Sequence, residues 1–522
     1  MSSPIGPVAP EKGGDEKNTN LHSLDVVDPD IITASPIHTD VALGLYKESF
    51  TLDFDRRELV AAKVRRKLDF ILLPMESNLQ SMCWVYFMQF LDKQTLNYSS
   101  AYGLQQDLNL VGRDYSWVAA LTNIGYLACA YPSTIALQKL PIGKFVTVMV
   151  MVWGAVLMLT CAVHNFAGIA AIRFILGGTE ACIGPAWISL TTMFWTREEA
   201  PLRMSCWLGM NGLSSLAGAG ISWGIGTIDH PAIATWKLVF LVIGAMSFVS
   251  GAGLFFILPS TPNDVRFFSH EEKVVSVWRI ASNRTGVKHS KILWYQIWEC
   301  LGDPKVYCIA LQALCLGILN GSVTNFMSIL LKGFGYDSLK SVQYQMPSGA
   351  IQFVCNISAG IFVSKVPNTL VLTIILGFIP GICGMIGIAT IDLKHQLSLT
   401  ACSWLQGIFG VSIILTWDLV GANIAGHTKR TTVNGVEFCF YAAGAIIGPF
   451  LFLPQEAPRY ITAIKTLCGI YGAAIFFTAI IGVLMVMENR RRSGLELAEE
   501  VADEQGFTDR TDLENKGFTY KL

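Results

Sequence analysis

Residues 145–163 read FVTVMVMVWGAVLMLTCAV, a run that no charged side chain interrupts. A helix needs about 20 mostly apolar residues to cross the hydrocarbon core of a bilayer. The run has that length and composition, so it predicts a transmembrane helix.

The same pattern recurs along the chain. Only 15% of the 522 residues are charged, against about 25% in soluble proteins. Hydrophobic residues make up 52%, and the mean hydropathy is +0.46. We expect an all-α polytopic membrane protein with twelve transmembrane helices, at residues 80–103, 115–138, 144–163, 167–194, 205–227, 236–258, 306–331, 342–364, 368–391, 400–424, 433–454 and 461–487.

Lysine and arginine predict the orientation, because they collect on the cytosolic side of membrane proteins. With twelve spans and a cytosolic N-terminus, the outside loops hold only Arg113, Lys332, Lys340, Lys394, Arg459 and Lys465. The inside segments hold many more bases, including Arg56, Lys63, Arg65, Lys139, Arg203, Lys273, Lys305, Lys429 and Arg490. We therefore expect a multi-pass protein, in the plasma membrane, with both termini in the cytosol.

The spans divide six and six around a polar stretch. Two six-helix halves joined by a long cytosolic loop are the layout of transporters built from two pseudo-repeated halves. We expect a cytosolic, largely disordered tail at 1–70 with no signal peptide, an N-terminal half at 71–259, a cytosolic loop at 260–305, a C-terminal half at 306–487 and a cytosolic tail at 488–522.

Several short motifs point to one family. They are LDKQTLNY at 91–98, NIGYL at 123–127, RFILGGTEACIGP at 173–185, LPSTP at 258–262, NG at 320–321, TNF at 324–326, GHTKR at 426–430 and EAPRY at 456–460.

Together these motifs resemble the fungal allantoate permease family, the anion:cation symporter branch of the major facilitator superfamily. The resemblance covers residues 60–490. It implies proton-coupled movement of a small, usually anionic, organic solute, without a cofactor. Asn123 and Tyr126 lie in one of the motifs, and we include them among the candidate substrate contacts.

The first span carries charges that a lipid-facing helix would not tolerate. A charge at the bilayer centre costs roughly 3 kcal/mol or more, unless it faces water, a partner or a substrate. Asp92 shares one helix face with Thr95, while Lys93 shares another with Asn97. We hypothesise that Asp92 exchanges a proton and that Lys93 attracts the anion. The alternative is a structural charge pair with another helix.

The fourth span carries a second pair of charges. Arg173 and Glu180 are seven residues apart, so they lie on one helix face, and Gly177 between them allows another helix to approach closely. The Arg173 guanidinium suits carboxylates, and Glu180 is a candidate proton carrier. A structural network within the N-terminal half is the alternative. Gly184 and Pro185 predict a break or kink in this helix.

Two acidic residues occupy the tenth and eleventh spans. A short loop joins these spans, so Asp418 and Glu437 could lie close together. They are candidate proton sites, or they bind the loop bases Lys429 and Arg430 as a structural gate, the interpretation that we favour. Neutral polar residues in apolar spans are candidate substrate contacts or helix bridges, namely Asn211, Asn320, Asn325, Asn356 and Tyr441.

Other classes of protein fit the sequence less well. The eight histidines fall in tails, loops or span ends, and no HExxH motif occurs, so we expect neither a histidine-bound metal nor an enzyme. No P-loop motif occurs, and no repeated filter motif suggests a channel. A net charge of −1 gives no reason to expect nucleic acid. A nutrient sensor built on a transporter fold is the remaining rival.

The expected function is secondary active transport by alternating access. The expected partners are a small organic anion or zwitterion (a carboxylate, a vitamin or a ureide), protons and the lipid bilayer. Export of a fungal secondary metabolite or pathway product on the same fold is the alternative to uptake. The sequence gives no basis for predicting the oligomeric state.

Overall fold

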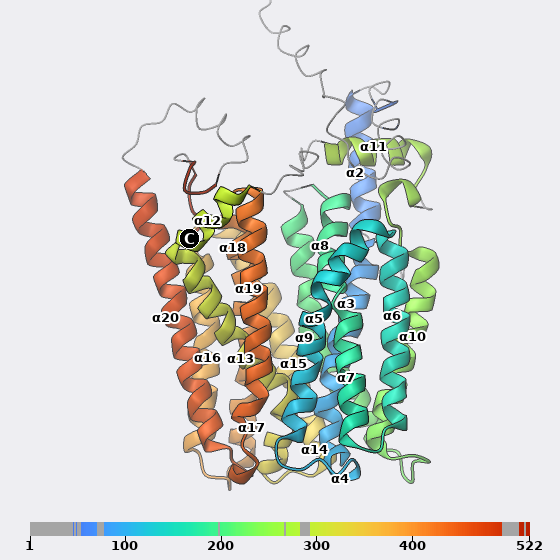
Figure 1. Ribbon diagram of the computed structural model, residues 1–522, viewed down its shortest axis with the longest axis vertical. Coiled ribbons are helices and arrows are strands. Elements are labelled where there is room, and N and C mark those ends of the chain that lie inside the picture. Colours follow the sequence, from blue (N-terminus) through green and yellow to red (C-terminus); the bar gives the residue numbers. More distant parts are fainter. Residues whose placement is uncertain are drawn as a thin grey trace, which may run out of the picture.

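The fold is known from a computed structural model. It describes residues 45, 48–49, 54–69, 78–196, 199–265, 268–281, 293–492, 511–515 and 518–522. Across these residues the chain is helical and contains no strand. The long helices form two bundles that lie side by side, and the N-terminal bundle is drawn in blue to green (Figure 1).

The helices follow the expected spans closely. The N-terminal half contains α3 (Asn78–Ala101), α5 (Asp114–Lys139), α6 (Ile142–Leu159), the broken span of α7 (Phe166–Glu180) and α8 (Ile183–Phe194), α9 (Ala200–Gly226) and α10 (Thr235–Ile257). The C-terminal half contains α13 (Pro304–Gly333), α14 (Ser338–Gln343) with α15 (Met346–Lys365), α16 (Leu370–Thr390), α17 (Gln396–Trp404) with α18 (Gly410–Asn423), α19 (His427–Ile447) and α20 (Ile461–Arg492).

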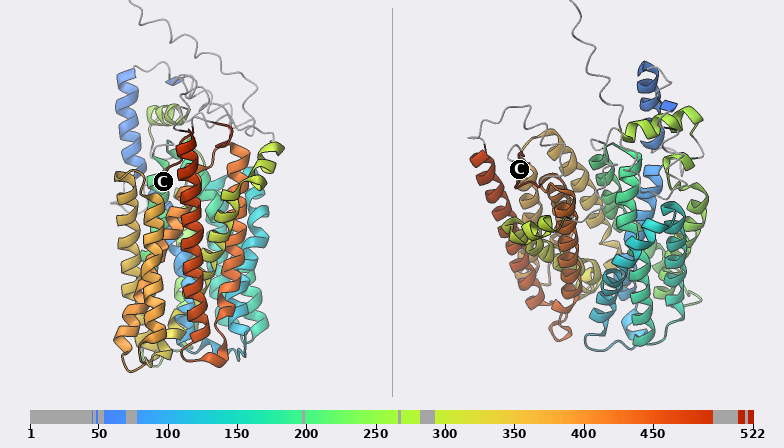
Figure 2. Two further views of the ribbon diagram at one scale, coloured as in Figure 1. Left: turned by 90° about the vertical axis from the view of Figure 1, so that its left-hand side faces the viewer. Right: turned by 45° about the horizontal axis from the view of Figure 1, so that its top comes forward.

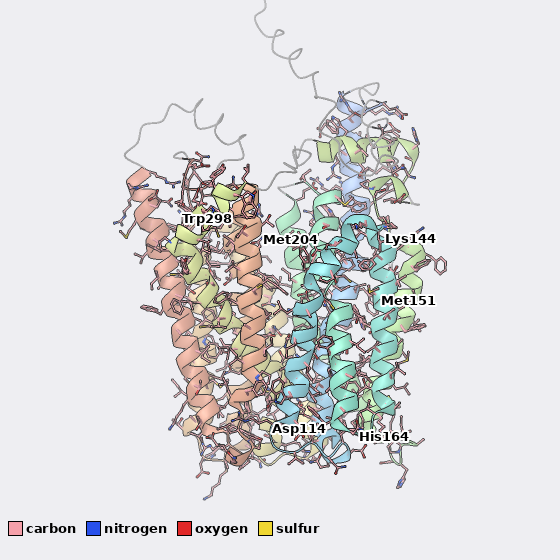
Figure 3. The ribbon with its side chains drawn as sticks, in the orientation of Figure 1. Asp114, Lys144, Met151, His164, Met204 and Trp298 are labelled. Atoms are coloured by element: carbon pink, nitrogen blue, oxygen red, sulfur yellow. The ribbon has the colours of Figure 1, made fainter. Side chains whose placement is uncertain are left out.

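The two ends of the bundle differ. We call the end that carries α2 (Phe54–Asp69), α11 (His270–Ala281), α12 (Trp294–Gly302) and residues 511–515 and 518–522 the terminal end. We call the opposite end, which carries α4 (Leu104–Asp107), α14 and α17, the far end (Figures 1 and 2). Figure 3 shows Lys144 toward the terminal end and His164 at the far end, so α6 runs from one to the other.

Apolar length explains most of these helices. Among the described residues, nine segments are long and apolar enough to cross a membrane, and α3, α5 and α9 are the long helices missing from that set. These three helices form contacts between the halves, α3 with α13, α5 with α19 and α9 with α15. Because their partners are protein helices, they can carry polar side chains that lipid would exclude.

Glycine allows the tightest helix pairs. A side chain at Gly177 of α7 would come within 1.8 Å of the Thr122 carbonyl oxygen of α5, as the sequence predicted for a close approach. In the C-terminal half, a side chain at Gly317 of α13 would lie 2.0 Å from the Tyr441 carbonyl oxygen of α19. The two backbones are in contact at both places. This packing fixes the positions of the neighbouring polar residues along the membrane normal.

The predicted tails contain ordered structure near the bundle. The last part of segment 1–70, expected to be largely disordered, forms α2, while residues 1–44 lie outside the described residues. The Arg56 side chain of α2 donates to Glu271 of α11 at 2.6 Å, and Lys67 donates to Glu272 at 2.8 Å. The end of the expected C-terminal tail also packs on the bundle, as described below.

Candidate functional site

Buried charges from two helices meet in the N-terminal half. Asp92 of α3 and Glu180 of α7 are fully buried, and Arg173 of α7 is 2% exposed. The three groups interact electrostatically with one another. The Arg173 guanidinium also lies over the Phe240 ring, 5.2 Å from its centre. The faces predicted for α3 and α7 therefore converge.

These charges leave hydrogen-bonding capacity unused. Within the described part of the chain, both carboxylate oxygens of Asp92 lack a hydrogen-bond partner, as do Nε and Nη2 of Arg173 and Oε1 of Glu180. Thr95 donates to the backbone carbonyl of Asp92 rather than to its carboxylate. Buried polar atoms in proteins are rarely left unpaired, so these atoms are positioned for water, a proton or a ligand.

Lys93 is the accessible cation of this group. Its ammonium lies 3.8 Å from Oε2 of Glu180, and its side chain is 35% exposed. The Gln89 amide donates to the same Glu180 oxygen at 3.3 Å. The Lys93 nitrogen also sits 5.5 Å from the centre of the Tyr126 ring. Glu180 thus holds a cation that solvent or a solute can reach.

Aromatic rings connect this cluster with the C-terminal half. The Tyr126 ring packs against Phe438 of α19, with 5.3 Å between ring centres. Tyr441, one turn further along α19, lies 6.4 Å from Trp417 of α18. On the other side, Tyr86 of α3 packs edge-on against Trp207 of α9. The Tyr126 ring, which faces the Lys93 ammonium, thus links this cation to Phe438 of the C-terminal half.

The remaining carboxylate at this depth is Glu437. It lies on α19, one turn before Tyr441, and is 5% exposed. Its Oε1 has no hydrogen-bond partner among the described residues. Asn211 of α9 lies beside the Tyr86 hydroxyl, and its side-chain oxygen Oδ1 has no hydrogen-bond partner among the described residues. The sequence predicted Glu437 as a candidate proton site and Asn211 as a candidate substrate contact.

Asn97, a predicted substrate contact, hydrogen-bonds the C-terminal half through both polar atoms of its amide. Its amide nitrogen donates to Gln345 at 2.7 Å, and its oxygen accepts the backbone N–H of Ser328 at 2.8 Å. Gln345 donates in turn to the Ser328 hydroxyl at 2.8 Å. This network, which we call the far-end gate, joins α3 to the C-terminal half near the far end.

Further bonds close the two halves near the same end. The Tyr115 hydroxyl donates to the Asn325 carbonyl at 2.8 Å, and Ser116 donates to the Pro449 carbonyl at 2.9 Å. Lys332 donates to the Ala101 carbonyl at 2.9 Å. Asn123 reaches the Ala445 carbonyl at 3.5 Å. The side-chain amide nitrogen of Asn325 donates to the Gly321 carbonyl of its own helix at 2.7 Å.

Sequence patterns missed the neutral centre of the C-terminal half. The Gln312 amide of α13 donates to Thr416 of α18 at 3.1 Å and to Thr478 of α20 at 2.8 Å. All three are fully buried. A glutamine in an otherwise apolar span was the signal that could have identified this centre. Of the other predicted polar residues, Asn356 of α15 is buried and Asn320 of α13 is half-buried.

The predicted pairing of Lys429 with Asp418 or Glu437 is wrong. Lys429 instead binds Glu299 at 2.9 Å, Asp303 at 3.1 Å and Asp512 at 2.8 Å. Asp418 faces the charge of Lys521 near the end of the chain. Lys429, in the first turn of α19, therefore points toward the end of α12 and the C-terminal residues. These segments supply three carboxylates, whereas α18 supplies only Asp418.

Comparisons with known proteins identify the family of this chain. The model of the Major Facilitator Superfamily matches residues 82–449. An uncharacterized transporter of Schizosaccharomyces pombe is 33% identical, covering 90% of this chain and 89% of its own. The allantoate permease of Saccharomyces cerevisiae is 30% identical, covering 97% and 98%.

A solved structure shows the same fold. It is a bacterial homolog of the human lysosomal transporter Spinster, in an inward-facing and unoccupied conformation. The TM-score is 0.53 at 13% sequence identity, with 82% of this chain and 95% of that chain covered.

Proposed function

Because the chain belongs to the major facilitator superfamily, in the branch that includes the yeast allantoate permease, we propose that it takes up a small organic anion or zwitterion together with a proton. The observation that carries this proposal is the set of buried, unpartnered polar atoms on Asp92, Arg173 and Glu180 beside the accessible ammonium of Lys93. A related permease named for allantoate, an anion, supports the substrate class.

The ion pair between Lys93 and Glu180 suggests how proton and solute are coupled. While Glu180 is ionised, it competes with the solute for the Lys93 ammonium, 3.8 Å away. A proton on Glu180 removes that competition, and the ammonium then binds the solute carboxylate. Proton and anion therefore enter the site together, and Arg173 balances the neighbouring Asp92.

The proposed access path opens toward the terminal end. The hydrogen bonds described above join the halves near the far end, so the solute would leave on the opposite side. The terminal end carries the basic residues of α2, including Arg56, Lys63 and Lys67, which favours its placement in the cytosol. In the plasma membrane this geometry corresponds to an inward-facing state of an uptake carrier.

Transport assays test the proposal directly. Cells that express the protein are given a panel of labelled organic anions, with and without a proton ionophore. We expect accumulation of one class of anion that the ionophore abolishes. No accumulation, with the protein confirmed at the cell surface, would contradict uptake. Export or sensing would then be tested by the retention of preloaded metabolites.

Lys93 offers a sharper test within the same assay. Lys93→Gln removes the ammonium, so we expect the apparent KM to rise at least tenfold, while Lys93→Arg retains part of the affinity. Lys139, at the end of α5 toward the terminal end, provides the matched control, and Lys139→Gln should leave the KM unchanged. An unchanged KM in Lys93→Gln would remove this residue from the substrate site.

A further inference from the structure

The last residues of the chain lie against the C-terminal half at its terminal end. Tyr520 is 1% exposed, and Thr511 and Asp512 are fully buried. The side chains of Phe518 and Leu522 pack against the hydrophobic core of the bundle. The segment of residues 511–515 and 518–522 is therefore integrated into the fold.

Amide side chains of two helices bind the backbone of this segment. Asn423, at the end of α18, donates to the Lys521 carbonyl at 3.0 Å and accepts the Lys521 N–H at 2.7 Å. Asn489 of α20 makes the same pair of bonds with Tyr520, at 2.8 and 2.9 Å. The Leu370 N–H of α16 donates to the Leu522 carbonyl at 2.9 Å. These paired bonds hold the backbone of the segment rather than its side chains.

A buried carboxylate anchors the other part of the segment. Asp512 accepts from Lys305 of α13 at 2.6 Å, pairs with Lys429 of α19 at 2.8 Å, and accepts from the Tyr520 hydroxyl at 2.7 Å. Burial by itself would raise the pKa of Asp512, but the charges of Lys305 and Lys429 outweigh it and lower the pKa below its ordinary value.

Arg492 closes the arrangement from the end of α20. Its guanidinium donates to the carbonyls of Asp512, Asn515 and Phe518, at 2.8, 3.1 and 2.7 Å. It also lies over the Tyr520 ring, 5.1 Å from the ring centre. Contacts to the segment thus come from α13, α16, α18, α19 and α20, which are five of the six spans of this half.

We infer that the terminal ends of these five helices form a peptide-binding groove whose ligand is the chain's own C-terminal segment, residues 511–515 and 518–522. The groove selects an acidic side chain near the start of the segment, at Asp512, and a tyrosine near its end, at Tyr520. Its occupant ties the five helices together, so the C-terminal half moves as one body. This role is separate from the transport proposed above.

Binding in trans tests the groove. A chain that ends at residue 510 is purified in detergent and titrated with a fluorescent peptide of residues 511–522. We expect saturable binding, and an Asp512→Asn peptide should bind at least tenfold more weakly. A Leu513→Ala peptide is the matched control, because Leu513 is 40% exposed, and it should bind as the native peptide does.

Two results would overturn the inference. One is no saturable binding to a shortened chain that is monodisperse, and the other is equal binding of the native and Asp512→Asn peptides. If the shortened chain aggregates, the inference is tested by thermal unfolding of the full chain. Asp512→Asn should then lower the melting temperature by about 3 °C or more while Leu513→Ala does not, and equal melting temperatures would contradict the groove.

Discussion

The two halves share one fold but place their charges differently. In the N-terminal half, Asp92, Arg173 and Glu180 are buried at the centre beside Lys93. In the described residues of the C-terminal half, the centre holds the neutral group of Gln312, Thr416 and Thr478, with Glu437 as its buried carboxylate. The ion cluster of that half, around Lys305, Lys429 and Asp512, lies at the terminal end.

This difference indicates a division of labour. Buried charge is costly in a membrane and persists where it has a function. The N-terminal half bears that cost at its centre, so we assign solute charge and proton to it. The C-terminal half supplies aromatic contacts through Phe438 and Tyr441, has Glu437 as its central carboxylate, and places its ion cluster at the terminal end.

Removing the central cation should have the largest effect. Arg173→Gln leaves two buried carboxylates with one cation fewer, and losing one partner of a buried pair typically costs about 3–5 kcal/mol. We expect uptake, normalised to surface protein, to fall at least about a hundredfold. Arg173→Lys keeps the positive charge but lacks the planar guanidinium with its several N–H donors, so it should retain part of the activity. Uptake at the native level in Arg173→Gln would contradict the assignment of the solute charge to the N-terminal half.

Carboxylates of the two halves should differ in their response to pH. Glu180→Gln removes the proposed proton site, so uptake should lose a pH dependence of up to about tenfold per pH unit. Glu437→Gln, in the other half, should keep that dependence. Initial rates of uptake between pH 4.5 and 7.5 give the comparison. The reverse pattern would transfer proton coupling to the C-terminal half.

The ion cluster at the terminal end should matter for stability. The pKa of Asp512 is lowered in the folded protein, so its contribution is present above the ordinary aspartate pKa of about 3.9 and is lost as the pH falls through the lower folded value. The melting temperatures of native protein and Asp512→Asn should therefore differ at pH 7 and converge only below about pH 4. Convergence already at pH 6 would contradict this sign.

The far-end gate tests the contact between the halves. Asn97→Ala and Gln345→Ala each remove the bond between them, and hydrogen bonds in membrane proteins contribute about 1 kcal/mol or less. We expect each change to increase labelling of a cysteine placed beside the gate by a few fold, and the double variant to add little. Full additivity would show that the two residues act independently.

The neutral centre should give the smallest effect. Gln312→Met removes two hydrogen bonds to threonine hydroxyls and leaves no unpaired charge. We expect uptake within about threefold of the native level and unchanged pH dependence, because a neutral bridge costs about 1 kcal/mol or less. A loss as large as that of Arg173→Gln would end the distinction between the halves.

Local pattern predicted much of this molecule. Apolar length located the spans, and a seven-residue spacing placed Arg173 and Glu180 on one face. The break near Gly184 and Pro185 falls between α7 and α8, as predicted. Contacts between segments that are distant in the sequence could not be predicted. The spacing along one helix cannot show that Asn97 bonds Gln345 or that Lys429 binds Asp512, since packing of separate helices decides both.

The central cluster also has an electrical consequence. With all four groups ionised, Asp92, Lys93, Arg173 and Glu180 carry two negative and two positive charges, so the empty carrier moves no net charge with this group. A proton on Glu180 and a monovalent anion on Lys93 again sum to zero. An uncompensated charge would respond to voltage by about 2.3 kcal/mol per 100 mV. We therefore expect uptake of a monovalent anion to follow the proton gradient and to ignore the membrane potential.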